Sequence, residues 1–185
     1  MYTLGITQGS HANRGPDEYF NKLQAWANDP AFAAVTGKNS APMRSIHGFF
    51  QEAFARPVEP AKQGGRELGQ GVIRAIDYVG PHVDDVSLHS NWDVNRLRHQ
   101  FAWNLYLSVG EHGGQTVVYG RTLDSKVDLR TAPQLRMMPS VGELIVFNSR
   151  LVHEVLVSSP AKRRISINGM FSPKPRGQQD IVTWS

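Results

Sequence analysis

Residues 78–85 read Tyr78-Val79-Gly80-Pro81-His82-Val83-Asp84-Asp85 and end an alternating segment that begins at Val72. Successive side chains of a β-strand point to opposite faces, so His82 and Asp84, two residues apart, point to the same face. An imidazole and a carboxylate arranged in this way can bind one metal ion together. A His-x-Asp pair also occurs often by chance, so its meaning depends on the motifs that follow it.

A second histidine, His153, completes a set of three metal-binding side chains. Two imidazoles and one carboxylate on one face of an octahedron leave the other face open, and this ligand set is typical of non-haem Fe(II) sites. His82, Asp84 and His153 are therefore the predicted metal ligands and catalytic centre. His89 is a poorer first ligand than His82, because the residue two positions after it is Asn91, a poor anionic ligand.

Further motifs follow the His-x-Asp pair in a fixed order. They are Gly113-Gly114-Gln115-Thr116, Pro139-Ser140-Val141-Gly142-Glu143-Leu144-Ile145-Val146-Phe147, His153-Glu154-Val155 and Arg163-Arg164-Ile165-Ser166. Several motifs in order are far more specific than any one of them, and together they resemble the Fe(II)/2-oxoglutarate-dependent oxygenase superfamily over roughly residues 72 to 172. In finer detail the chain is most similar to the bacterial branch of hydroxylases and halogenases that act on free amino acids or similar small metabolites.

The resemblance implies a reaction and its cofactors. Members of the superfamily use Fe(II), 2-oxoglutarate as cosubstrate and O2, release succinate and CO2, and oxidise an unactivated C–H bond of the substrate. The expected function is therefore a dioxygenase that hydroxylates a small molecule, such as a free amino acid or a derivative. Related halogenases have Gly or Ala at the position of Asp84, so this carboxylate indicates hydroxylation.

Four residues are expected to bind 2-oxoglutarate. Arg164 would present a guanidinium group to the far carboxylate, with Ser166 on the same strand face, whereas Arg163 would point to the opposite face. Along residues 101–108 one face carries Phe101, Trp103, Leu105 and Leu107 and is predicted to be core. The other face carries Asn104 and Tyr106, an amide and a phenol that can hold a carboxylate.

Candidate substrate contacts lie near the predicted metal ligands. The polar segment 86–100 follows those ligands directly and is expected to be a lid over the open metal face. It contains one exposed-looking tryptophan. The candidates are Arg74, Asp85, Trp92 and Asn168.

The expected fold is mainly β with N-terminal helices, an antiparallel double-stranded β-helix (jelly roll) of the cupin type. Helices are predicted over 16–27, 30–35 and 46–54, followed by a long loop over 55–71. Strands are predicted over 72–79, 101–108, 116–119, 143–147, 151–157 and 164–171. Residues 1–185 are expected to form one domain, with a helical and loop lead-in over 1–70 and a jelly-roll core over 71–172. His47 has no partner at ligand spacing and is interpreted as an ordinary structural histidine.

Composition narrows the partners and the compartment. The 185 residues are 40% hydrophobic and carry a formal charge of +4, which is ordinary for a globular domain with a solvated basic face and does not favour nucleic-acid binding. The absence of cysteine and of a visible secretory signal suits a cytoplasmic protein. The expected partner is a small-molecule substrate, with no nucleic acid and no membrane, and the oligomeric state is left open.

Two alternatives remain open from the sequence. The same chemistry could act on a protein side chain, for which an open, charged groove near the lid would be expected. A jelly-roll module could also retain the metal without turnover. Succinate formation from 2-oxoglutarate separates this silent module from both enzymes.

Overall fold

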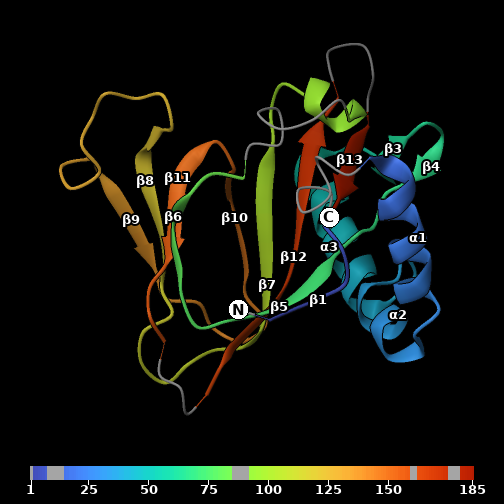
Figure 1. The fold of residues 1–185 in the computed structure, drawn as a ribbon, viewed down its shortest axis with the longest axis horizontal. Coiled ribbons are helices and arrows are strands. Elements are labelled where there is room, and N and C mark those ends of the chain that lie inside the picture. Colours follow the sequence, from blue (N-terminus) through green and yellow to red (C-terminus); the bar gives the residue numbers. More distant parts are fainter. Residues whose placement is uncertain (1, 8–14, 85–91, 159–161, 175–179) are drawn as a thin grey trace.

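Two β-sheets face each other in the computed structural model, which describes residues 2–7, 15–84, 92–158, 162–174 and 180–185 (Figure 1). Seven of the described strands form the larger sheet and four form the smaller one. A separate two-stranded hairpin consists of β3 (Lys62–Gln63) and β4 (Arg66–Glu67). The facing sheets confirm the predicted jelly roll.

The larger sheet is built around β12 (Arg164–Pro173), which pairs antiparallel with β5, β7 and β13. Three more strands extend the sheet. β10 pairs with β7 and β1 pairs with β5, both antiparallel, and β2 pairs in parallel with β13. The bounds are β1 (Tyr2–Leu4), β2 (Val58–Pro60), β5 (Val72–Ile76), β7 (Phe101–Ser108), β10 (Leu144–Asn148) and β13 (Ile181–Trp184). The sheet therefore includes β1 and β2, in segments before residue 70 that were predicted to be loop. It also includes β13, after residue 180, where no strand was predicted.

The smaller sheet has the order β6-β11-β8-β9. Its strands are β6 (Val79–His82), β8 (Thr116–Thr122), β9 (Gln134–Met137) and β11 (Leu151–Val155). The single strand predicted over 72–79 is wrong, because the chain leaves the larger sheet after Ile76 and joins the smaller sheet at Val79. Side chains alternate in the same way in both sheets, so periodicity could not reveal the crossover. The crossover places His82 on the sheet opposite Arg74.

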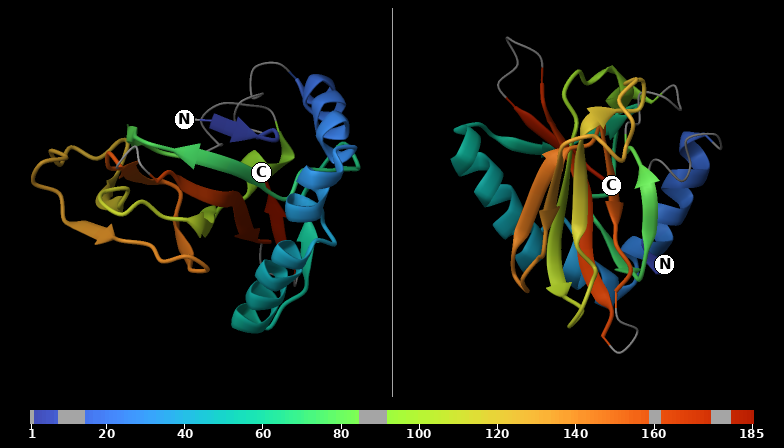
Figure 2. Two further views of the ribbon diagram at one scale, coloured as in Figure 1. Left: turned by 90° about the horizontal axis from the view of Figure 1, so that it is seen from below. Right: turned by 90° about the vertical axis from the view of Figure 1, so that its left-hand side faces the viewer.

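The helices lie beside the larger sheet, on the side away from the smaller sheet (Figures 1 and 2). They are α1 (Pro16–Ala27), α2 (Pro30–Thr36) and α3 (Ala41–Phe54), and a short 3-10 helix, η3, spans Asp93–Arg96. The side chain of Asp29 accepts hydrogen bonds at the start of α2, and that of Ser40 does so at the start of α3. None of the helices in the described ranges has the length and apolar character needed to cross a lipid bilayer.

The outer face of the larger sheet packs against α3. Met43, Ile46 and Phe50 of the helix belong to one buried cluster with Trp103, Ile167 and Phe171 of the sheet. The predicted core face of β7 is thus confirmed except at Leu107, which is 42% exposed because it lies at the strand end, outside this cluster. The opposite face of β7 is buried as well, and it carries Asn104 and Tyr106.

Trp92 corrects a prediction. It was expected to be exposed on a lid, but it is 3% exposed and packs edge to face on Tyr19 of α1, with ring centroids 5.2 Å apart. Both rings belong to a buried apolar cluster with Trp184 of β13. The polar residues around Trp92 in the sequence hid this role, since its partners lie far away along the chain. Trp92 is a core residue.

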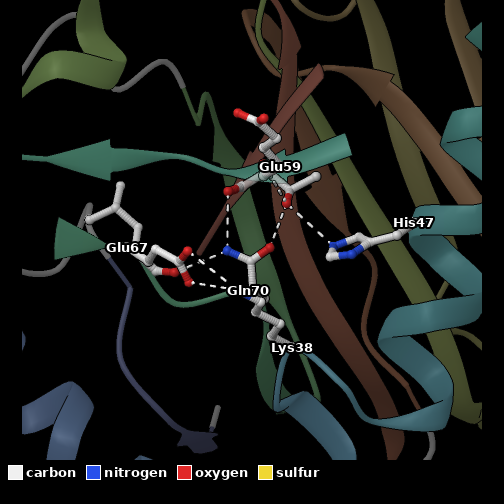
Figure 3. Close-up of polar contacts among 7 residues, drawn as sticks. Lys38, His47, Glu59, Glu67 and Gln70 are labelled. Atoms are coloured by element: carbon white, nitrogen blue, oxygen red, sulfur yellow. Dashed lines mark hydrogen bonds and ion pairs between the residues drawn. The ribbon is translucent and has the colours of Figure 1, made fainter. Parts of the chain in front are cut away.

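His47 lies in a polar network between α3 and the larger sheet (Figure 3). Its Nε2 is 3.3 Å from the Thr183 hydroxyl, which donates to the Gln70 side chain at 2.5 Å. The Gln70 amide in turn donates to the Leu68 carbonyl at 2.9 Å. Burial lowers the pKa of His47, so the neutral imidazole is favoured. The interpretation of His47 as a structural histidine is confirmed.

Candidate metal centre

The three predicted ligands converge between β6 and β11. His82 and His153 are register partners on these antiparallel strands, and their ring centroids lie 4.2 Å apart. Asp84 lies two residues after the end of β6, and its backbone N–H donates to the Ser149 carbonyl at 3.0 Å. Its carboxylate oxygens lie 3.4 Å from His153 Nε2 and 3.9 Å from His82 Nε2. One potential ligand atom from each residue lies within 4.8 Å of the others.

Backbone carbonyls orient both imidazoles. His82 Nδ1 lies 2.8 Å from the Gly80 carbonyl oxygen, and His153 Nδ1 lies 3.0 Å from that of Leu151. A carbonyl oxygen only accepts, so Nδ1 carries the proton in each ring and Nε2 offers its lone pair to the centre. Phe147 further fixes the His153 ring through a T-shaped contact, in which the two ring centroids lie 4.7 Å apart.

The protonation states suit a metal ion. Burial, together with the neighbouring His153, lowers the pKa of His82, which favours the neutral imidazole that binds metals. Burial alone would raise the pKa of Asp84, but its contact with His153 and the positive charge of Arg74 outweigh burial, so that pKa lies well below its usual range. A neutral His82 imidazole and an ionised Asp84 carboxylate fit Fe(II).

A buried guanidinium group lies farther inside the jelly roll. Arg164 is 2% exposed, and its Nη2 donates to the Tyr106 hydroxyl at 2.9 Å and to the Thr116 hydroxyl at 3.1 Å. Its Nε and Nη1 are buried and have no hydrogen-bond partner within the described residues. Leaving such donors unpaired is costly, so the arrangement fits a bound anion such as a carboxylate of 2-oxoglutarate.

Arg163 points away from the interior, as strand parity predicts. Its guanidinium lies over the Tyr2 ring at 4.8 Å and its Nε is 3.8 Å from an Asp77 carboxylate oxygen. About half of its side chain is exposed, with a relative area of 48%. The two neighbouring arginines therefore form a matched pair, one inside and one outside.

Thr116 was missed as a site residue, although its motif was recognised. Gly113 has φ +74, and a Cβ there would lie 2.0 Å from the Val157 carbonyl oxygen, while the Gly114 N–H donates to that same oxygen at 3.2 Å. The two glycines thus let the turn approach the end of β11 closely and start β8 with Thr116 beside Arg164. The inward parity of a hydroxyl residue two positions after the Gly-Gly turn was the signal that could have identified it.

Replacing Gly113 by alanine should destabilise the protein by about 2 kcal/mol or more, since alanine is strained at positive φ and its Cβ meets the backbone. Thermal unfolding should then shift down by about 4–8 °C for a chain of this size. Gly64→Ala is the matched control, because Gly64 has φ +56 and nothing within 4 Å of the added Cβ. Equal shifts for the two variants would contradict the close approach at Gly113.

Three other predicted residues form a polar ladder on the inner face of the larger sheet. The Ser166 hydroxyl donates to Asn168 Oδ1 at 3.1 Å, and the Asn168 amide donates to Asn104 Oδ1. Asn104 and Asn168 are register partners on β7 and β12, so they meet directly across the sheet. Ser166 and Asn104, expected beside the cosubstrate carboxylate, thus bond to Asn168, and Tyr106 bonds to Arg164.

The remaining candidates differ in position. Arg74 lies on β5 as the register partner of Ser166, and its Nε is buried without a hydrogen-bond partner among the described residues. Asp85 lies outside the described residues. Trp92 is in the core, as described above.

Known proteins resemble the chain in sequence. The family model of the 2OG-Fe(II) oxygenase superfamily matches residues 72–172. Leucinostatins biosynthesis cluster protein S of Purpureocillium lilacinum is 26% identical over 98% of this chain and 84% of its own. L-gamma-glutamyl-L-propargylglycine hydroxylase of Streptantibioticus cattleyicolor is 27% identical over 70% of this chain, and the match spans about half, 53%, of its own length.

Solved structures share the fold. The N-substituted L-amino acid dioxygenase of Burkholderia ambifaria AMMD superimposes with a TM-score of 0.69 at 17% identity, over 98% of this chain and 77% of its own. A second structure of that enzyme, in complex with alpha-KG, gives a TM-score of 0.70 at 16% identity over the same shares. At such identities the similarity concerns the arrangement of helices and strands.

Proposed function

Because the chain belongs to the 2OG-Fe(II) oxygenase superfamily, we propose that it is an Fe(II)- and 2-oxoglutarate-dependent dioxygenase that hydroxylates a small molecule of the amino-acid type. The observation that carries this proposal is the pairing of two elements inside one jelly roll. One is the convergence of His82, Asp84 and His153, and the other is Arg164, a buried arginine with unpartnered donors. Either element alone would support only metal binding or anion binding.

Each residue of the proposed centre has a defined task. His82, Asp84 and His153 would hold Fe(II), which when bound supplies, with 2-oxoglutarate and O2, the oxidation of an unactivated C–H bond and the release of succinate and CO2. The Gly80 and Leu151 carbonyls keep both imidazoles in the tautomer that a metal needs. Fixed ligands of this kind hold the coordination geometry while cosubstrate and substrate enter and leave.

Arg164 would bind the far carboxylate of 2-oxoglutarate. Tyr106 and Thr116 accept from one nitrogen of its guanidinium group and so hold it in place, while Nε and Nη1 remain available. A prepositioned guanidinium loses little conformational freedom when the anion binds, which strengthens the interaction.

The small-molecule substrate is supported by the relatives rather than by one contact. The similar proteins include a hydroxylase of an amino-acid derivative and a dioxygenase of N-substituted amino acids. The ladder of Ser166, Asn168 and Asn104 adds polar groups on the inner face of the sheet that could orient such a molecule. We infer no role in binding nucleic acid.

The test is succinate formation from 2-oxoglutarate with Fe(II) and O2, with and without a panel of amino acids and N-acylated amino acids. We expect turnover that rises with at least one member of the panel, followed by mass spectrometry of the oxidised product. Turnover stimulated by proteins or peptides alone would favour a protein side-chain hydroxylase. The absence of any succinate would favour a silent metal-binding module.

The product should carry a hydroxyl group even at high chloride or bromide concentration. Asp84 fills the coordination position that halogenases leave open for a halide, so no halide should reach the metal in its place. Mass spectrometry of the product formed with each halide present checks this. A halogen isotope pattern in the wild-type product would overturn the assignment of Asp84 as a ligand.

A further inference from the structure

Two arginines from neighbouring strands reach the inner face of the larger sheet. Arg164 lies on β12 and Arg74 on β5, where Arg74 is the register partner of Ser166, two residues after Arg164. Side chains at paired positions of a sheet lie on the same face, so Arg74 lies beside the ladder of Ser166, Asn168 and Asn104. The inner face therefore carries more positive charge than one cosubstrate carboxylate requires.

Arg74 has no counter-ion in the described part of the chain. Its Nε is buried without a hydrogen-bond partner, and none of the ion pairs among the described residues involves it. Arg66, Arg130 and Arg163, by contrast, pair with aspartates at the surface. Arg74 is half-buried, and a buried Nε donor without a partner is costly to folding, so its presence calls for a ligand.

Arg74 projects into the space between the two sheets. It shares a strand face with Ser166, its register partner on β12, whose hydroxyl belongs to the polar ladder. His82 and His153 lie on β6 and β11 of the facing smaller sheet. A molecule held between the sheets would lie between Arg74 and the proposed metal ligands.

A count of charges identifies what Arg74 lacks. Fe(II), Asp84 and Arg164 together carry two net positive charges, and the two carboxylates of 2-oxoglutarate balance them. Among the described residues of the site the charge of Arg74 is left over, and one further anionic group would neutralise it. Neither the metal centre nor the cosubstrate supplies such a group.

We propose that Arg74 binds a carboxylate of the substrate, so that the substrate class is a small molecule with a free carboxylate, such as an amino acid or an N-acylated amino acid. This inference rests on the proposed function. The carboxylate lies against Arg74, and the amides of Asn104 and Asn168 beside it face the neutral polar groups of the same molecule. A substrate without the carboxylate leaves the guanidinium group unpaired and binds weakly.

Calorimetric binding to protein loaded with Mn(II) and 2-oxoglutarate tests the proposal without turnover. The probes are L-leucine, L-phenylalanine and their N-acetyl derivatives, each compared with its primary carboxamide. At least one acid should bind about 10- to 100-fold more tightly than its amide, since a hydrogen bond to a charged group strengthens binding by about this factor. Equal binding of acids and amides, or binding of none of the acids, would overturn the proposal.

Variants separate a binding role from a structural one. Arg74→Gln should reduce the affinity for the acid to that for the amide, and Arg74→Lys should keep part of the preference, while Arg163→Gln, which removes an exposed arginine, should change neither. The affinity for 2-oxoglutarate should stay within about twofold of wild type, a change worth less than half a kcal/mol. Arg74→Gln should also unfold at the same temperature as wild type or higher, because it removes a half-buried charge whose Nε has no partner among the described residues.

Two results would reassign Arg74. A large loss of 2-oxoglutarate affinity in Arg74→Gln would make it a cosubstrate residue, and a marked fall in unfolding temperature for both Arg74 variants would make it structural. The proposed function fails separately, if wild-type protein with Fe(II) forms no succinate. The comparison of acid and amide still reports on Arg74 in that case.

Discussion

Replacing His153 by alanine should abolish Fe(II) binding and reduce turnover of 2-oxoglutarate by at least about a hundredfold. His153 is 4% exposed, lies opposite His82 across two strands and contacts Asp84. Its loss leaves two ligands, which cannot define the three-ligand face that Fe(II) requires. Equilibrium dialysis against Fe(II) under anaerobic conditions, with succinate measured in parallel, checks both parts. His82→Ala and Asp84→Ala should behave in the same way.

His47→Ala is the matched control for the histidine variants. His47 is also partly buried, but it bonds to Thr183 on the side of the larger sheet that carries α3. Its removal should lower the free energy of unfolding by about 1 kcal/mol and leave Fe(II) binding unchanged. If His153→Ala retained stoichiometric Fe(II) and turnover, His153 would not be a ligand.

Arg164→Ala should weaken 2-oxoglutarate binding by about 150- to 5000-fold, because loss of one partner from a buried charge pair costs about 3–5 kcal/mol. Calorimetric titration of 2-oxoglutarate into Mn(II)-loaded protein measures this. Arg163→Ala removes the same charge from the neighbouring position, where the side chain is 48% exposed, and should have little effect. The reverse result would mean that β12 is shifted by one residue.

Local geometry made part of the site predictable. The parity of a strand placed His82 and Asp84 on one face and separated Arg164 from Arg163, and this needs only the two-residue repeat of extended backbone. His153 was predicted from the ordered motifs, and the fold followed from many short strands after a helical start. The structure brings these residues together, while their function as ligands stays a prediction until it is measured.

Features that depend on long-range packing were not predictable. The break between β5 and β6 leaves the alternation of side chains unchanged, so a single strand was the natural interpretation. The burial of Trp92 is caused by Tyr19, which is distant in the chain, and polar neighbours in the sequence suggested the opposite. Thr116 acquires its role only through the close approach of the Gly-Gly turn to β11.

The most direct measurement is a crystal structure of the protein loaded anaerobically with Fe(II) and 2-oxoglutarate, with anomalous data collected at the iron edge. We expect one iron peak about 2.1 Å from His82 Nε2, His153 Nε2 and an Asp84 carboxylate oxygen. We also expect the far carboxylate of 2-oxoglutarate on Arg164. An iron peak elsewhere, or an iron bound by fewer than all three residues, would contradict the proposed metal centre.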